Sequence, residues 1–180
     1  MYKRLPILIY GILVLLIGIL LVLSSYCSFK MITLSTGITL IVAGLFAFLA
    51  AYVQEKKQVQ FVYHSLHSLA MILYGSTILL FGISIERFID FTTFLFVFYA
   101  VSEIIFCNWL FNLNQKTIYK TIIIRFLLGL AIGFSAAMVM NFKSYQLESF
   151  GVLFVLVGVN MILYTPAMKG KENPVVESNL

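Results

Sequence analysis

The residues of this sequence that could do chemistry are a few polar side chains within long apolar segments. Glu103 lies inside one such segment, about eight residues or about 12 Å from its nearer end at the 1.5 Å rise of a helix. Arg125 and Asn160 lie near one end of two further segments, and His67 opens another. An ionisable group in hydrocarbon costs about 2.5–3.5 kcal/mol on insertion scales. These four residues are therefore candidates for one intramembrane polar site.

Three interpretations of this site are open from the sequence. In the first, Glu103 forms a structural hydrogen bond or ion pair with Arg125 or Asn160 and joins helices. In the second, Glu103 is a protonatable group in a cavity that faces the cytoplasm and couples to the movement of protons or a solute. In the third, Glu103 faces lipid as a neutral acid. Burial favours the neutral acid and a nearby cation favours the carboxylate, so the sequence alone does not decide its charge.

Enzyme chemistry and bound cofactors have little support in the sequence. No serine has a histidine and an acid in plausible reach, and no glycine loop begins a helix after a strand. His64 and His67 are three residues apart and could bind a metal, but no third ligand is apparent beyond Glu103. Cys27 and Cys107 fall near opposite membrane surfaces and cannot bond to each other. We therefore expect a protein that is not an enzyme and holds no metal or cofactor.

The composition indicates a membrane protein. Of 180 residues, 62% are hydrophobic and 11% are charged, which is too little polar surface for a fold in water. The net charge of +5 comes from scattered lysines and arginines without a basic stripe, which argues against nucleic-acid binding. The strict alternation of a membrane-spanning barrel is absent, so the fold class is an all-α membrane protein.

Six apolar segments are long enough to cross a bilayer, since a membrane-spanning helix needs about 20 apolar residues. They are about Leu5–Leu23, Met31–Val53, Leu66–Ile85, Phe91–Phe111, Thr121–Met140 and Leu147–Pro166. The loops between them are too short to fold separately, so 1–168 is expected to form one transmembrane domain. The polar segment 169–180 is predicted to be a disordered tail.

Basic residues are distributed unequally between the two sides of the membrane. One side carries Lys3, Arg4, Lys56, Lys57, Lys116, Lys120, Lys169 and Lys171, and the other carries Lys30, Arg87 and Lys143. The positive-inside rule therefore predicts that both termini are cytoplasmic. We treat the first segment as a retained helix, because no small-x-small cleavage site follows it.

Small residues seven positions apart indicate an internal repeat. Tyr10-Gly11 to Gly18 aligns with Tyr74-Gly75 to Gly82 at an offset of 64, and Gly129 to Ala136 follows at a further offset of 54. A weaker echo is present in the even-numbered helices, at Gly37 and Gly44 and at Gly151 and Gly158. Because seven residues make nearly two helical turns, each pair lies on one face, where a neighbouring helix can approach closely.

The repeat predicts three tandem helical hairpins in parallel orientation, about 1–55, 61–113 and 117–168. The alternative is that glycines are simply common in membrane helices. The repeat alignment also places His67 and Arg125 near the membrane interface, where Arg125 could snorkel to the headgroups. Glycine faces left over after the bundle forms would favour a homo-oligomer, which the sequence does not decide.

A family resemblance rests on three glycine-containing stretches. They are the first helix with Gly11 and Gly18, the following Gly37-Ile38 to Ala43-Gly44-Leu45, and the last helix with Val157-Gly158-Val159-Asn160-Met161-Ile162. With three tandem hairpins, the chain resembles the HdeD-like family of small bacterial inner-membrane proteins, from about Leu8 to Tyr164. The resemblance implies a six-helix inner-membrane protein without an agreed biochemical activity, in some members linked to acid resistance. We therefore expect a non-enzymatic membrane protein with the lipid bilayer as partner, related to stress response or acid resistance. The alternative is a small transporter or channel with a protonatable site at Glu103.

Overall fold

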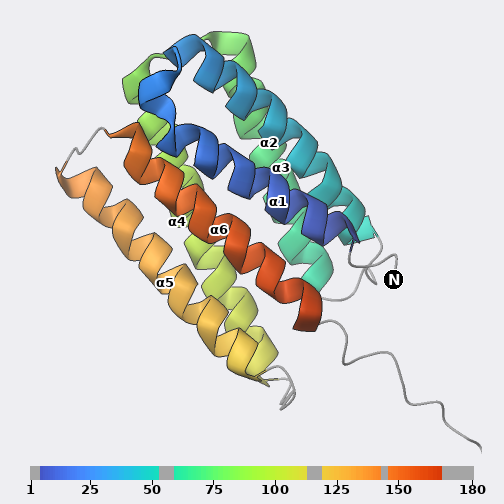
Figure 1. Ribbon diagram of the computed structural model, residues 1–180. Coiled ribbons are helices and arrows are strands. Elements are labelled where there is room, and N and C mark those ends of the chain that lie inside the picture. Colours follow the sequence, from blue (N-terminus) through green and yellow to red (C-terminus); the bar gives the residue numbers. More distant parts are fainter. Residues whose placement is uncertain (1–4, 53–58, 113–118, 143–145, 168–180) are drawn as a thin grey trace, which may run out of the picture.

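The computed structural model describes residues 5–52, 59–112, 119–142 and 146–167. Within these ranges the chain forms six α-helices in one bundle and no strand, so the predicted all-α fold class is confirmed (Figure 1). The helices are α1 (Leu5–Val22), α2 (Phe29–Tyr52), α3 (Val59–Phe81), α4 (Ile85–Asn112), α5 (Tyr119–Phe142) and α6 (Leu147–Ala167). A short 3-10 turn, η1 (Ser24–Tyr26), joins α1 to α2. The predicted tail 169–180 lies outside the described residues.

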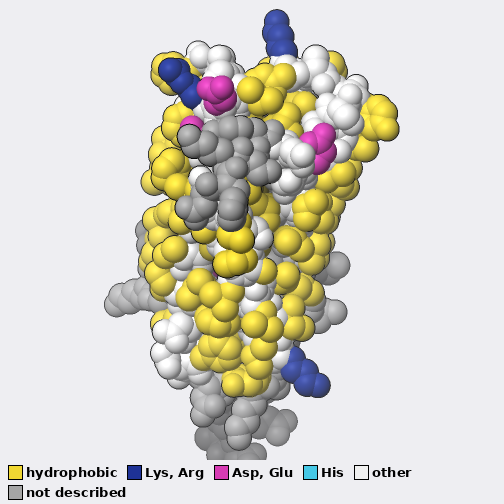
Figure 2. Space-filling model, turned by 90° about the vertical axis from the view of Figure 1, so that its left-hand side faces the viewer, with side chains coloured by type: hydrophobic (Ala, Val, Ile, Leu, Met, Phe, Trp, Pro, Cys, Tyr) yellow, Lys and Arg dark blue, Asp and Glu magenta, His cyan; other side chains and the backbone are white. Residues whose placement is uncertain are grey.

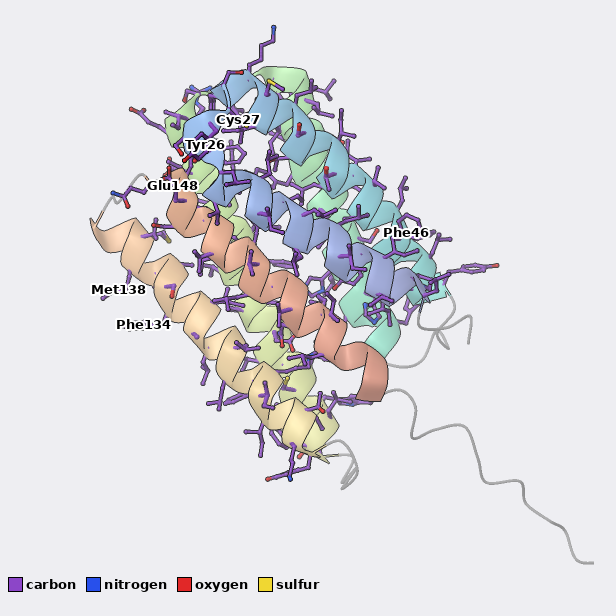
Figure 3. All side chains as sticks on the ribbon, viewed as in Figure 1. Tyr26, Cys27, Phe46, Phe134, Met138 and Glu148 are labelled. Carbon is purple, nitrogen blue, oxygen red and sulfur yellow. The ribbon has the colours of Figure 1, made fainter. Side chains whose placement is uncertain are left out.

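The helices have the length and the surface of a membrane protein. Five of them, α1 to α5, are long and apolar enough to cross a bilayer, whereas the described apolar stretch of α6, Leu147–Leu163, is shorter. On the face shown in Figure 2, the charged side chains lie near the two ends of the molecule, with hydrophobic side chains between them. Phe134 and Met138, for example, point outward from α5 (Figure 3) and are 67% and 40% exposed. Such a surface is suited to lipid rather than to water.

Two helices begin well before the apolar segments that predict them. The structure begins α3 at Val59 rather than near Leu66, and α4 at Ile85 rather than near Phe91. Hydropathy detects only the apolar part of a helix, whereas the backbone hydrogen bonds continue through more polar residues. As a consequence, His67 lies inside α3, more than two turns from its first residue, and not at its start.

The closest helix pairs join helices of different predicted hairpins. Extensive contacts join α1 to α6, α2 to α3 and α4 to α5, whereas the contacts of α3 with α4 and of α5 with α6 are sparse. Because α6 packs against α1 (Figure 1), the six helices close into a ring. The two helices of each predicted hairpin therefore pack closely against helices of the two other hairpins, and less closely against each other.

The close pairs are built on glycines that have no room for a side chain. A Cβ atom on Gly18 of α1 would lie 2.5 Å from the backbone nitrogen of Val155, and one on Gly151 of α6 would lie 2.5 Å from that of Val22. Both distances are shorter than any ordinary contact, so backbone would have to move. The predicted packing glycines in close pairs are Gly11, Gly18, Gly151 and Gly158 between α1 and α6, Gly37, Gly44 and Gly75 between α2 and α3, and Gly129 between α4 and α5.

Gly82 differs from the other predicted packing glycines, and for this residue the prediction is wrong. It follows the last residue of α3, has a φ of +53°, and an added Cβ would meet nothing within 4 Å. Glycine reaches this left-handed conformation without strain and commonly ends helices there. Gly133 of α5 was missed, although a Cβ on it would lie 2.9 Å from Ala100 Cβ. The seven-residue spacing from Gly129 predicts a packing position at Ala136 instead.

A side-chain hydrogen bond is present at the end of the bundle where α1 ends and α6 begins. Ser24 Oγ in η1 donates a hydrogen bond to Glu148 Oε1 at 3.1 Å, in the region where Figure 3 labels Tyr26, Cys27 and Glu148. The carboxylate also stands in the first turn of α6, where a negative charge is favourable. This contact adds to the close packing of α1 on α6.

We expect Gly18→Ala to lower the free energy of unfolding by about 1–3 kcal/mol, because the new methyl group must displace the backbone of α6. Thermal unfolding of the purified protein in detergent would show a reduced midpoint. Ala131→Leu is the matched control, since Ala131 is exposed on α5. Equal midpoints for the two variants would contradict the packing role of Gly18.

Candidate functional site

The centre of the site is a buried ion pair between α4 and α5. Arg125 Nε donates to Glu103 Oε1 at 2.7 Å and Arg125 Nη2 donates to Glu103 Oε2 at 2.8 Å. The two side chains are 1% and 0% exposed. The planar guanidinium therefore meets the carboxylate with two parallel hydrogen bonds, the strongest geometry for this pair. The prediction that the Arg125 side chain snorkels to the headgroups is wrong, because the side chain turns into the bundle toward Glu103.

Two further groups donate to the same carboxylate. The hydroxyl of Tyr63 on α3 donates to Glu103 Oε2 and accepts from Arg125 Nη2 at 3.2 Å. Cys107, one turn beyond Glu103 on α4, donates its thiol to Glu103 Oε1 at 3.4 Å. Each carboxylate oxygen thus has two donors. Tyr63 is 3% exposed, so this network connects three helices out of contact with solvent.

Two aromatic rings lie close to the guanidinium. The Arg125 Cζ atom lies 5.4 Å from the centre of the Phe106 ring and 5.9 Å from that of the Tyr63 ring. These two rings stack on each other with their centres 4.2 Å apart. A cation over aromatic faces gains electrostatic stabilisation when it is removed from water. The site therefore compensates the buried charge on the side of the arginine as well as on the side of the carboxylate.

His67 is attached to this network through the backbone. Its Nδ1 lies 2.8 Å from the carbonyl oxygen of Tyr63, and its Nε2 lies 3.2 Å from Ser102 Oγ. Because a carbonyl only accepts, a neutral ring carries its proton on Nδ1 and accepts from the Ser102 hydroxyl at Nε2. A protonated ring would donate from both nitrogens, and the Ser102 hydroxyl would then donate only to the Tyr99 carbonyl, 2.8 Å away. His67 is 2% exposed and is buried inside the bundle.

Asn160 lies in the bundle but binds a different partner from the one predicted. Its Nδ2 donates to the hydroxyl of Tyr99 at 2.6 Å and so connects α6 to α4. Its Oδ1 has no hydrogen-bond partner among the described residues. The neighbouring Met161 accepts a hydrogen bond from the hydroxyl of Tyr10 on α1. The structure thus brings Glu103 and Arg125 into direct contact and places His67 and Asn160 around them.

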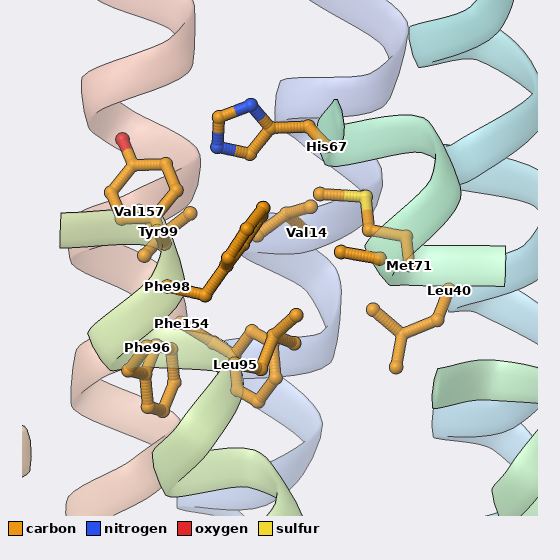
Figure 4. A pocket seen from close by; sticks show the side chains of 11 residues that line it. Val14, Leu40, His67, Met71, Leu95, Phe96, Phe98, Tyr99, Phe154 and Val157 are labelled. Carbon is orange, nitrogen blue, oxygen red and sulfur yellow. The ribbon is translucent and has the colours of Figure 1, made fainter. Parts of the chain in front are cut away.

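A small cavity adjoins His67 and Tyr99 (Figure 4). It has a volume of about 20 Å³, and the rest of its wall is hydrophobic, with Val14, Met71 and Phe154 among the side chains. A water molecule needs about 10–15 Å³ and several polar partners, so this space has room for one water at most. Glu103 does not line the cavity. The carboxylate is therefore not part of the wall of this cavity.

Several residues of the site were missed by reasoning from the sequence, although a signal for them exists. Tyr63 stands four residues before His67, Tyr99 four before Glu103, and Cys107 four after it. Residues four apart share a helix face, so each of these residues lies beside a predicted site residue.

Within the described ranges, no group of three or more histidine, cysteine, aspartate or glutamate side chains is arranged to hold a metal ion.

We expect Tyr63→Phe to destabilise the protein by about 1–3 kcal/mol, because the buried carboxylate loses a donor and the guanidinium loses an acceptor. Thermal unfolding in detergent would measure the loss. Tyr52→Phe provides the control, since Tyr52 is 73% exposed. A Tyr63→Phe variant as stable as this control would show that the hydroxyl does not support the ion pair.

The comparison with protein families concerns the first half of the chain. Residues 9–81, from α1 to the last residue of α3, match the family model of a short repeat of unknown function (DUF308). HdeD-like proteins belong to this family. No curated protein and no solved structure matches the chain. Over α1 to α3 the chain is therefore similar to a family that is defined by a short repeat.

Proposed function

We propose that this chain is a non-enzymatic integral membrane protein of the bacterial inner membrane, with both termini in the cytoplasm. In this proposal the pair of Glu103 and Arg125 is structural and holds the bundle closed. The observation that carries the proposal is the bidentate pair itself, at 2.7 and 2.8 Å, with both side chains at most 1% exposed. An ion pair of this kind is retained where it specifies which helices meet and in which register.

The position of the network supports this structural role. Tyr63, Glu103 and Arg125 come from α3, α4 and α5, and the contact of α3 with α4 is one of the two sparse ones between consecutive helices. Asn160 and Tyr99 similarly connect α6 to α4, two helices that make few other contacts. Hydrogen bonds thus also join helix pairs that lack close glycine packing. Loss of the network would leave the contact of α3 with α4 with fewer specific interactions, among them the hydrogen bond from Tyr74 to the Phe88 carbonyl.

The same geometry argues against a proton-coupled transporter. A carboxyl that takes up protons during transport needs a path from water and a free oxygen. Both oxygens of Glu103 already accept hydrogen bonds, and the small cavity beside His67 does not reach Glu103 and has a mostly apolar wall. We extend the proposal to a role in the response to acid or envelope stress, which rests on the resemblance to HdeD-like proteins; the repeat family that residues 9–81 match is of unknown function.

A double-mutant cycle tests the structural pair. We expect Glu103→Met and Arg125→Met each to cost about 3–5 kcal/mol, because each leaves one buried charge without its partner. The double variant should cost less than the sum, because no unpaired charge remains. Unfolding in detergent by heat or denaturant gives the three values, with Lys120→Met, at an exposed position of α5, as control. Strictly additive losses would mean that the two side chains do not act as a pair.

Proton flux distinguishes this function from transport. Proteoliposomes with the wild-type protein and an interior pH dye should respond to an imposed pH gradient like empty liposomes, because the buried carboxylate is held by four hydrogen bonds. Glu103→Gln serves as the comparison, after gel filtration shows that it is folded. Flux in the wild type that disappears in Glu103→Gln would overturn the structural role and favour a transporter.

A further inference from the structure

The surface between α3 and α4 carries a groove outside the buried polar network. Its volume is about 260 Å³, and it lies where these two helices contact each other sparsely. It is lined by Ala70, Leu73, Tyr74 and Thr77 from α3 and by Phe91, Phe94, Leu95 and Phe98 from α4. The two hydroxyls in it are used within the protein: Thr77 donates to the Leu73 carbonyl at 2.8 Å and Tyr74 to the Phe88 carbonyl at 3.1 Å. The groove therefore offers apolar contacts to a ligand.

A charged residue continues the phenylalanine side of the groove. Arg87 precedes Phe91 by four residues, Phe94 by seven and Phe98 by eleven, so all four side chains lie on one face of α4. Arg87 stands about 6 Å beyond Phe91 along the helix, toward the end of the bundle where α4 begins. It is exposed, and no described residue accepts a hydrogen bond from its guanidinium. The cation thus lies beyond the phenylalanine side of the groove, at the end of the bundle where α4 begins.

The cation has acidic neighbours that restrict the ligand. Glu86 and Asp90 are exposed within one turn of Arg87 on the same helix. A purely anionic headgroup would meet both carboxylates and be repelled. A headgroup with a phosphate and a primary ammonium would pair with both signs of charge. A quaternary ammonium carries no N–H group and could not donate to the carboxylates.

We propose that the groove between α3 and α4 binds a zwitterionic aminophospholipid of the bilayer. The phosphate pairs with Arg87, the ammonium with Glu86 or Asp90, and one acyl chain lies along Phe91, Phe94 and Phe98. The groove shares Ala70, Leu95 and Phe98 with the small cavity beside His67, so the end of the acyl chain lies next to that cavity. This site depends on the bilayer but not on the role of Glu103, so the two proposals can fail separately.

Native mass spectrometry of the intact protein, released from detergent with one added lipid at a time, tests the headgroup. We expect phosphatidylethanolamine to bind at least about fivefold more tightly than phosphatidylglycerol or phosphatidylcholine with the same chains. Arg87→Gln should weaken phosphatidylethanolamine binding about tenfold, the loss expected for one charge-assisted hydrogen bond. The double variant Glu86→Gln/Asp90→Asn should lose the preference over phosphatidylglycerol. Lys30→Gln, an exposed cation near the same end of the bundle, should change nothing.

A second pair of variants tests the groove itself. Leu73→Trp fills it from α3 and should reduce phosphatidylethanolamine binding, whereas Leu127→Trp, on the equally exposed Leu127 of α5, should not. Thermal unfolding of both variants shows that they are folded. Equal binding of the three lipids by the wild type would overturn the headgroup assignment, and unchanged binding by Leu73→Trp would overturn the groove as the site.

Discussion

The central contact of the proposed structural role is the ion pair between the Glu103 carboxylate and the Arg125 guanidinium, which are both buried. At such a depth each charge is costly alone, so the fold loses about 3–5 kcal/mol when Glu103 and Arg125 are not within hydrogen-bonding distance. That requirement sets the register of α4 against α5, because a shift of one residue would move the two groups about 1.5 Å apart along the axis. Tyr63 extends the same requirement to α3, since its hydroxyl contacts both members of the pair.

The six helices are joined by two kinds of contact, close glycine packing and hydrogen bonds between polar side chains. Glycines let α1 approach α6 and α2 approach α3 until backbone meets backbone, and in lipid this close packing replaces the hydrophobic effect as the source of association. The α4–α5 pair combines both kinds, since a Cβ on Gly129 would lie 3.1 Å from Glu103 Cγ. Where glycine packing is absent, between α3 and α4, polar side chains cross the contact inside and an apolar groove remains on the surface. The polar side chains inside this helix pair and the apolar groove on its surface therefore both follow from the sparse contact of α3 with α4.

The fold was predicted from the sequence more completely than the site. Apolar length gave α1 to α5 and the all-α class, because each span is a property of its own residues. Hydropathy misjudged the beginnings of α3 and α4, where backbone hydrogen bonds carry the helix past the apolar stretch. The repeat found most of the packing glycines, yet it could not say that they join one repeat to the next, because the same small face can serve either neighbour.

The sequence by itself determined which segments are apolar and how far along each of them the polar residues stand. That is why Glu103 and Arg125 could be named as candidate partners from their depth. Only the tertiary structure decided that the arginine turns inward, that Asn160 contacts Tyr99 instead of Glu103, and that Tyr63 completes the network. Depth along a helix follows from counting residues, whereas a partner is set by the rotation of each helix about its axis and by the neighbours it packs against. Those two quantities depend on all six helices at once.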